Sequence, residues 1–282
     1  FKNCYCIVSI VRIPILTIRI REKERSMSNA AAQSLWQARL NHKVLPRDFE
    51  SFPTSEAEAY AIQKAMILHC DRQVIGWKLG ATLSAAMETI GVKGPFIGPL
   101  FADFCYYNGD TVKLYPRQAL ETEFTIRIKR DIPYRLKSYP IGEIEAAIDA
   151  IIPSFEIIGC RFEGEIKNSK YRPIADGGAN VGFILGQEFT DWDRETLSDH
   201  EVTFNLNGER VATGKPSDLS WEHLFESVSW LARQPVMAER GLIAGDLIMT
   251  GTITGMTPLA PGDVAEANFG NMGIVRAQFE DH

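Results

Sequence analysis

The sequence has 282 residues, 45% of them hydrophobic and 23% charged, a composition typical of a globular protein with one large domain or two small ones. Its formal net charge of −6 argues against nucleic acid as a partner, because phosphate binding requires a basic surface. The five cysteines are scattered and form no CxxC pair. This usage indicates a reducing compartment, and we expect a cytoplasmic protein.

The first 26 residues differ from the rest of the chain. Their apolar run, residues 7–20, is too short to cross a membrane and is interrupted by Arg12 and Arg19. No small-residue cleavage site follows it. We interpret residues 1–26 as an upstream or disordered extension outside the functional domain, with a targeting peptide as the alternative, and expect no membrane partner.

Residues 27–100 are predicted to form a helical N-terminal part. From Ser28 to about Asp71 the apolar residues recur at helical spacing, and Thr54 or Ser55 stands before acidic residues, as at a helix start. The stretch "VIGWKLGAT", residues 74–82, indicates a short strand that ends in glycine.

Residues 101–282 are predicted to form a β-rich catalytic domain. Within it "SYPIGEIEAAIDAIIPS" reads as a helix that Pro153 stops, and "SWEHLFESVSWLARQ" as another. Elsewhere short apolar segments alternate with turns, and there is no GxGxxG or GxxxxGK[ST] motif. The chain is therefore expected to have an α+β fold with mostly antiparallel strands.

The stretch "LETEFTIRI", residues 120–128, places two glutamates on one face of a predicted strand. Side chains alternate along a strand, so Glu121 and Glu123 point the same way. Thr125 and Arg127 share that face, which leaves open an ordinary solvent-facing side. The alternative is a pair of carboxylates that bind a metal or transfer protons.

A third carboxylate, Glu156, lies in the apolar stretch "IIPSFEIIGCRF". An ionised carboxylate buried there must be protonated, paired or bound to a cation. A salt bridge to Arg161 is one solution, and a cation shared with Glu121 and Glu123 is the other. Three carboxylates suit Mg²⁺ or Mn²⁺. No histidine or cysteine lies near these glutamates in the sequence, which argues against zinc.

Two further polar residues stand out. Lys78 lies in the apolar strand "IGWKLG", where an unpaired lysine is unusual. Asp176 precedes Gly177 and Gly178, a pattern that more often marks a turn than a functional carboxylate.

Taken in order, several segments resemble a known family. They are "AYAIQ", "GWKLGAT", "GVKGPFIGPLF", "ETEF", "FEIIGCRF", "IADGGANVGFILG" and "GDLIMTGTITGMTPLAPGD". From about residue 55 to 279 the chain is similar to the hydratase and decarboxylase branch of the fumarylacetoacetate hydrolase superfamily, which includes 2-keto-4-pentenoate hydratases and 4-oxalocrotonate decarboxylases. The resemblance implies a helical part on a mixed β-sandwich roll, with a divalent metal in its mouth.

The resemblance also implies roles for single residues. The metal ligands would be Glu121, Glu123 and Glu156, binding Mg²⁺ or Mn²⁺. The proton-transfer groups would be Lys78, with a pKa lowered by burial and the cation, or Asp176. The substrate would contact Thr252, Gly80 and Asn180. Three departures lie around the pocket. Gly177, Gly178 and Ala179 stand where the family has Asn-Ala-Ser, and Leu83 replaces a serine. The stretch "CRFEGEIKNSKYRP" is longer and more polar than the resemblance implies.

The function implied by the resemblance is that of a metal-dependent lyase of aromatic compound catabolism. It would hydrate a small 2-hydroxydienoic or 2-keto-enoic acid and work as a homo-oligomer. The alternatives are decarboxylation or C–C hydrolysis of a related 2-keto acid, because all three reactions require the same enolate stabilisation. A catalytically silent binding relative is the remaining alternative.

Overall fold

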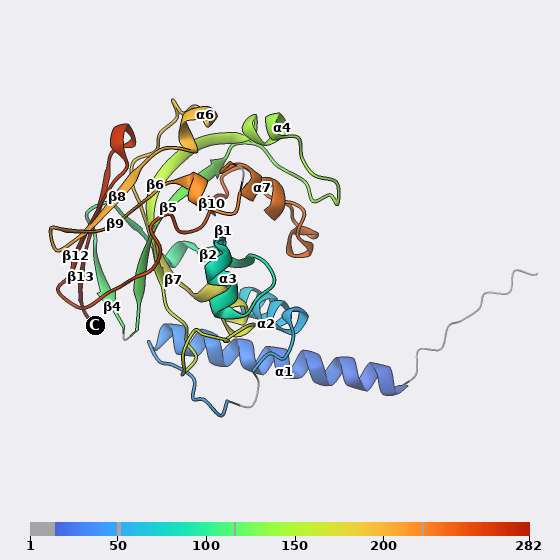
Figure 1. Ribbon diagram of the computed structural model, residues 1–282. Helices are drawn as coiled ribbons and strands as arrows, with labels where there is room; N and C mark the ends of the chain where they lie inside the picture. The colour runs from blue at the N-terminus through green and yellow to red at the C-terminus, as the bar shows by residue number, and fades with distance from the viewer. Residues whose placement is uncertain (1–14, 50–51, 116, 222) are drawn as a thin grey trace, which may run out of the picture.

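The computed structural model describes residues 15–49, 52–115, 117–221 and 223–282, with side chains from Ser26 onward. In this part of the chain two β-sheets pack against each other, and helices cover the rest of the larger sheet (Figure 1). The larger sheet has the order β2-β1-β10-β5-β6-β7-β3, with β11 paired to β5. The smaller sheet has the order β4-β13-β12-β8-β9. This confirms the predicted α+β class.

The strands of the larger sheet are β1 (Val74–Gly80), β2 (Phe96–Phe101), β3 (Cys105–Tyr107), β5 (Ala119–Ile128), β6 (Ile148–Ile158), β7 (Asn180–Leu185), β10 (Leu247–Met249) and β11 (Thr257–Pro258). Those of the smaller sheet are β4 (Thr111–Leu114), β8 (Val202–Leu206), β9 (Glu209–Gly214), β12 (Val264–Asn268) and β13 (Ile274–Asp281). Most neighbouring strands run antiparallel; the pairs β1–β10, β3–β7 and β4–β13 are parallel.

The α-helices are α1 (Ile15–Leu40), α2 (Glu56–His69), α3 (Ser84–Ile90), α4 (Ile141–Glu145), α5 (Arg172–Ala175), α6 (Arg194–Leu197) and α7 (Glu226–Leu231). Single 3₁₀ turns occur at η1 (Ala102–Phe104), η2 (Gly177–Ala179), η3 (Pro216–Asp218), η4 (Pro235–Met237) and η5 (Gly270–Met272). Among the helices of the described residues, none has the length and apolar character that a membrane span requires.

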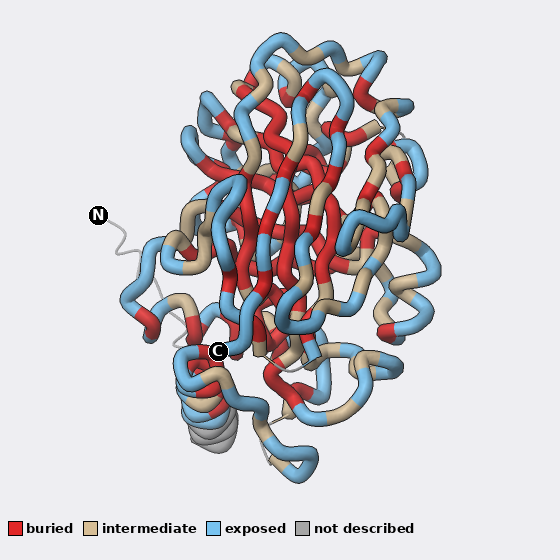
Figure 2. The backbone as a smooth tube through the Cα atoms, turned by 90° about the vertical axis from the view of Figure 1, so that its left-hand side faces the viewer, coloured by how far each residue is buried: buried red, intermediate tan, exposed pale blue. Residues whose placement is uncertain are grey.

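The main core lies between the two sheets. Phe155 of β6 meets Phe204 of β8 edge-on at 5.8 Å between ring centroids, and Phe124 of β5 meets Phe269 at 5.2 Å. All four residues are fully buried. Figure 2 shows that buried residues, drawn in red, fill the centre of the molecule. Side chains alternate along a strand, so the residues next to Phe124 in β5 and next to Phe155 in β6 point to the opposite face of the larger sheet.

A second core joins the N-terminal helices to the edge of the larger sheet. Leu35 and Trp36 of α1 and Met66 of α2 are buried in the same cluster as Phe101 of β2. Ser55 caps α2 as the sequence predicted, because its side chain accepts a hydrogen bond from the backbone N–H of Glu58.

The expected division at residue 100 falls inside β2. The strands β1 and β2 lie in the same sheet as β5 and β6, so residues 27–100 share that sheet with residues 101–282. The helix expected after Met27 begins earlier, at Ile15. The rest of the predicted extension, residues 1–14, lies outside the described residues.

The helix predicted up to Pro153 is wrong for most of its length. It is confined to α4, and β6 then runs through Pro153, which lies opposite Phe124 of β5. The segment that follows α4 is rich in isoleucine, whose branched side chain packs well in a buried strand. Those β-branched residues outweighed the helical spacing.

Gly76 allows the backbones of β1 and β10 to lie close together. A Cβ at this position would lie 2.0 Å from the carbonyl oxygen of Leu247, its partner in the parallel pair. We expect Gly76→Ala to lower the free energy of unfolding by about 2 kcal/mol or more, because the backbones must separate. Urea unfolding measures this loss. Gly94→Ala is the control, since nothing lies within 4 Å of a Cβ there; equal stabilities of the two variants would contradict the expectation.

Candidate metal centre and active site

The pairing of β5 and β6 brings three glutamates together. Glu121 lies directly opposite Glu156 in the antiparallel register, and Glu123 follows two residues later on the same face. One carboxylate oxygen of each lies within 4.8 Å of those of the other two. Glu121 is 9% exposed, and the other two are fully buried. The solvent-facing interpretation of the pair is therefore wrong, and the carboxylate cluster exists.

Such a cluster is unfavourable without a cation. Burial and the charge of Glu156 raise the pKa of Glu121 to about 7. Burial, Glu156 and Glu121 raise the pKa of Glu123 well above its usual range. Like charges directly opposite one another destabilise a sheet. When all three carboxylates are ionised, the cluster and the Lys78 ammonium leave two net negative charges, which one divalent cation balances.

Lys78 reaches the cluster from β1, which is not a neighbour of β5 or β6 in the sheet. Its Nζ lies 3.0 Å from Oε2 of Glu156 and donates a hydrogen bond of 3.0 Å to the carbonyl oxygen of Gly178. In a flat sheet β1 and β6, which have β10 and β5 between them, would lie roughly 14 Å apart, farther than a lysine side chain extends. The contact shows that the sheet curls so that its concave face encloses the glutamates.

Without a metal, the pKa of Lys78 shifts in the direction opposite to the one expected for a lysine beside a bound cation. Burial alone would lower this pKa, but the carboxylates of Glu156, Glu121 and Glu123 together outweigh burial and raise it. The side chain is 3% exposed. It is therefore a buried ammonium held by negative charge.

Gly178 explains one departure from the family pattern. Its φ is +76°, and a Cβ there would lie 2.8 Å from Cδ of Lys78 and 3.0 Å from Cα of Gly98. Glycine at both positions lets the η2 turn approach β2 closely enough to present the Gly178 carbonyl to Lys78. The Gly-Gly sequence thus fixes the lysine, which sequence reasoning did not foresee.

The remaining carboxylate oxygens have unequal surroundings. The backbone N–H of Gly251 donates to Oε2 of Glu123 at 2.8 Å, and Nδ2 of Asn180 donates to Oε1 of Glu156 at 2.8 Å. In contrast, Oε1 of Glu123 is buried and has no hydrogen-bond partner in the described part of the chain. A buried carboxylate oxygen without a partner, next to two other carboxylates, fits a hard oxygen-binding cation.

Asp176 occupies a different position from the one expected. Arg161 holds both of its carboxylate oxygens, through the backbone N–H at 2.6 Å and Nε at 2.5 Å. Nη2 of Arg161 also donates to the backbone carbonyl of Asn180 at 2.8 Å. Arg161 therefore pairs with Asp176 and not with Glu156. The two residues fix Asn180, whose amide group orients Glu156.

A cavity of about 230 Å³ opens beside the cluster. Lys78, Glu121, Gly80 and Thr252 line it, whereas Asn180 and Asp176 do not. Most of its remaining wall is apolar: Leu79, Ala81, Leu83, Ala85, Ala86, Ile90, Phe96, Ile158, Ile166, Pro173, Ala179 and Met256. The structure thus joins a carboxylate cluster and a buried lysine to a small apolar chamber.

The sequence of this chain is similar to those of known proteins. The family model described as "Fumarylacetoacetate (FAA) hydrolase C-terminal" matches residues 108–280, more than half of the sequence. A 2-keto-4-pentenoate hydratase of Paraburkholderia xenovorans (strain LB400) is 30% identical over 89% of this chain and 94% of its own length. A 4-oxalocrotonate decarboxylase of Pseudomonas sp. (strain CF600) is 32% identical over 92% of this chain and 99% of its own length.

A solved structure agrees. The 4-oxalocrotonate decarboxylase from Pseudomonas putida G7, complexed with magnesium and adipate, superposes with a TM-score of 0.79 at 29% identity. The match covers 90% of this chain and 98% of that one. The same decarboxylase has also been solved with calcium and acetate. Together these matches show that the chain belongs to the fumarylacetoacetate hydrolase family.

Proposed function

We propose that this protein is a metal-dependent hydratase of a small 2-hydroxydienoic or 2-keto-enoic acid. The observation that carries the proposal is the buried Glu121–Glu123–Glu156 cluster, which faces Lys78 beside an apolar cavity. Relatives named 2-keto-4-pentenoate hydratases support it. Relatives named 4-oxalocrotonate decarboxylases make decarboxylation the second candidate.

The three glutamates would hold Mg²⁺ or Mn²⁺. Their donor set consists of carboxylate oxygens alone, and the cluster of described residues includes no histidine or cysteine. Such a cation, when bound, would act as a Lewis acid that stabilises negative charge on the oxygen atoms of a 2-keto acid. Asn180 and the Gly251 amide hold one oxygen each of Glu156 and Glu123, which pre-orients both carboxylates.

Lys78 is the proton-transfer group that we propose. It lines the cavity, and Glu156 and the Gly178 carbonyl fix its ammonium group. A positioned ammonium can give a proton to a carbon of the bound acid and take one back. Asp176 is the weaker candidate, because Arg161 occupies both of its carboxylate oxygens. We assign Asp176 a positioning role.

The cavity wall favours a substrate with one carboxylate. Apart from Lys78, no lysine, arginine or histidine of the described residues lines it. A second carboxylate, as in a dicarboxylic keto acid, would therefore enter an apolar chamber without a cation, which is unfavourable. Small apolar side chains such as Ala85 and Ala86 instead suit a short hydrocarbon tail. This supports hydration of a monoacid over decarboxylation of a diacid.

We also propose that the protein works in the cytoplasm and as a homo-oligomer. The three described cysteines Cys70, Cys105 and Cys160 are free thiols, as a reducing compartment would keep them. Analytical ultracentrifugation of the purified protein measures the oligomeric state.

The metal proposal predicts the effect of removing one ligand. Glu123→Gln keeps the shape of the side chain but loses its charge, so the Mn²⁺ affinity should fall on the order of 100-fold. Titration calorimetry measures this affinity. In wild type, Mn²⁺ at 100 times its Kd should add about 2.7 kcal/mol to the free energy of unfolding.

The control for this experiment is Glu209→Gln, which changes an exposed glutamate of β9. It should bind Mn²⁺ as wild type does. If Glu123→Gln also kept its Mn²⁺ affinity, the cluster would not be the metal site.

The role of Lys78 predicts a separation of chemistry from metal binding. Lys78→Met keeps most of the side-chain volume and removes the ammonium group. We expect kcat for 2-hydroxypentadienoate to fall on the order of 100-fold or more, because proton transfer is lost. The Mn²⁺ affinity should fall much less than in Glu123→Gln. If Lys78→Met remained active, another group would have to be the one that transfers the proton.

The apolar wall predicts the choice of substrate. With Mg²⁺, the protein should consume 2-hydroxypentadienoate, followed by loss of the dienol absorbance, and release no CO₂. The dicarboxylic analogue 4-oxalocrotonate should be a poor substrate. Met256→Arg adds a cation at the half-exposed rim of the cavity and should raise kcat/KM for the diacid relative to the monoacid. Rapid CO₂ release from the diacid by wild type would favour decarboxylation.

A further inference from the structure

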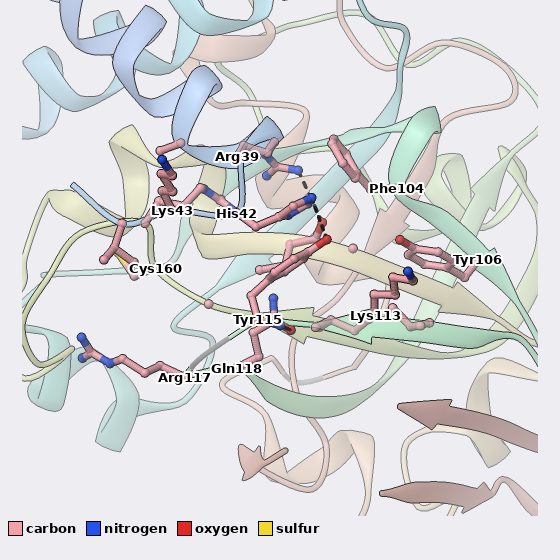
Figure 3. A pocket seen from close by; sticks show the side chains of 18 residues that line it. Arg39, His42, Lys43, Phe104, Tyr106, Lys113, Tyr115, Arg117, Gln118 and Cys160 are labelled. Atoms are coloured by element: carbon pink, nitrogen blue, oxygen red, sulfur yellow. Dashed lines mark hydrogen bonds between the residues drawn. The ribbon is translucent and has the colours of Figure 1, made fainter. Parts of the chain in front are cut away.

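A larger cavity, of about 410 Å³, lies on the other side of the larger sheet from the carboxylate cluster. It sits where the end of α1 meets β4 and the strands β6 and β7 (Figure 3). Glu156 faces the cluster, and its neighbour in β6, Ile157, faces this second cavity. We call it the basic pocket and define it by Arg39, His42, Phe104, Tyr106, Lys113 and Tyr115.

The lining of the basic pocket is positively charged. Arg39, Lys43, Lys113, Arg117 and Arg161 line it, and no aspartate or glutamate of the described residues does so. Arg161 is paired with Asp176. The other four form no ion pair with any described residue. In a chain with a net charge of −6, this concentration of unpaired cations is suited to an anion.

Arg39 is the innermost of these cations. It is 4% exposed, and its Nη1 and Nη2 donate to the backbone carbonyls of Val181 and Asn180. Its Nε is buried and has no partner among the described residues. Burial and the like charge of Arg161 lower the pKa of Arg39, and the nearby Asp176 offsets this only in part. A buried guanidinium with a free N–H lacks only an acceptor.

The wall around Arg39 is largely aromatic. Its Cζ lies 4.6 Å from the ring centroid of Phe104, and Tyr106 stands farther along the same side of the pocket (Figure 3). His42 and Tyr115 stack with 3.5 Å between ring centroids, and their Nε2 and hydroxyl oxygen are 2.7 Å apart. Flat rings beside a cation select a flat apolar body with a negative group at one end.

We propose that the basic pocket is a second binding site, separate from the metal centre, for a small organic anion with one carboxylate and a flat apolar body. The carboxylate accepts from the Nε of Arg39, and the apolar body lies against Tyr106, Tyr115 and Val112. The exposed Lys43 and Lys113 at the rim attract the anion. The proposal does not depend on the reaction carried out at the metal centre.

The test uses 1-naphthoate as the probe and the neutral 1-naphthamide as its uncharged counterpart. Binding of both is measured by titration calorimetry to the full chain with Mg²⁺. The double variant Lys43→Glu/Lys113→Glu reverses charge at the rim, where folding is not at risk. Its matched control, Lys129→Glu/Lys137→Glu, makes the same charge change at exposed positions outside the pocket. Arg39→Met removes the innermost cation.

Because a carboxylate could also bind the metal, the titration is repeated with Glu121→Gln. We expect 1-naphthoate to bind wild type, Glu121→Gln and the lysine control with similar affinity. Its affinity should fall on the order of 10-fold or more in the rim variant and in Arg39→Met, since charged hydrogen bonds and attraction are lost. If Arg39→Met does not fold, as judged by circular dichroism, the rim variant decides.

Three results would overturn the proposal. In the first, 1-naphthamide binds as tightly as 1-naphthoate, which makes the pocket merely apolar. In the second, binding disappears in Glu121→Gln, which places the probe at the metal centre. In the third, wild type does not bind the probe at all, as would happen if a second copy of the chain covered the pocket.

Discussion

The mutual repulsion of three buried carboxylates is the constraint on which the rest of this structure depends. Glu121, Glu123 and Glu156 are held together by strand pairing, in a place where water cannot screen their charges. One lysine offsets a single charge and leaves −2. Such an arrangement is stable only if a ligand offsets the repulsion between the carboxylates. A cation with two positive charges and a preference for oxygen ligands does so.

The fold must also bring Lys78 close to the glutamates, although they lie on strands that are not neighbours. The pairing of β5 with β6 brings the glutamates together, because all three lie at neighbouring positions on two adjacent strands. Lys78, by contrast, belongs to a strand beyond β10, and it arrives because the sheet curls and because Gly98 and Gly178 permit close backbone approach. The cluster is therefore rigid where it must bind a metal. The cavity next to it is lined by the same strands and also by α3 and several loops. Loops can vary in shape among related proteins, and with them the substrate that fits.

The carboxylate cluster could be predicted from the sequence more readily than the residues that hold it in place. An E-x-E pair in a strand and a glutamate in an apolar strand are local signals, and the structure brings those residues together. The partner of Arg161 was not predictable, because Glu156 and Asp176 are both plausible acids and only the path of the chain selects Asp176. The helix predicted up to Pro153 is wrong for a similar reason. A proline commonly ends a helix, but Pro153 lies within β6, opposite Phe124 of β5. The basic pocket gathers residues from four distant segments, so no sequence window contains it.

Asn180 connects the two sides of the larger sheet. Its side chain donates to Glu156 on the metal side, while its backbone carbonyl accepts from Arg39 and Arg161 on the side of the basic pocket. Arg39 and Arg161 thus hold the backbone of Asn180 from one side of the sheet, and its amide group holds Glu156 on the other. A residue that orients a carboxylate of the cluster in this way must itself be fixed, and two guanidinium groups fix it.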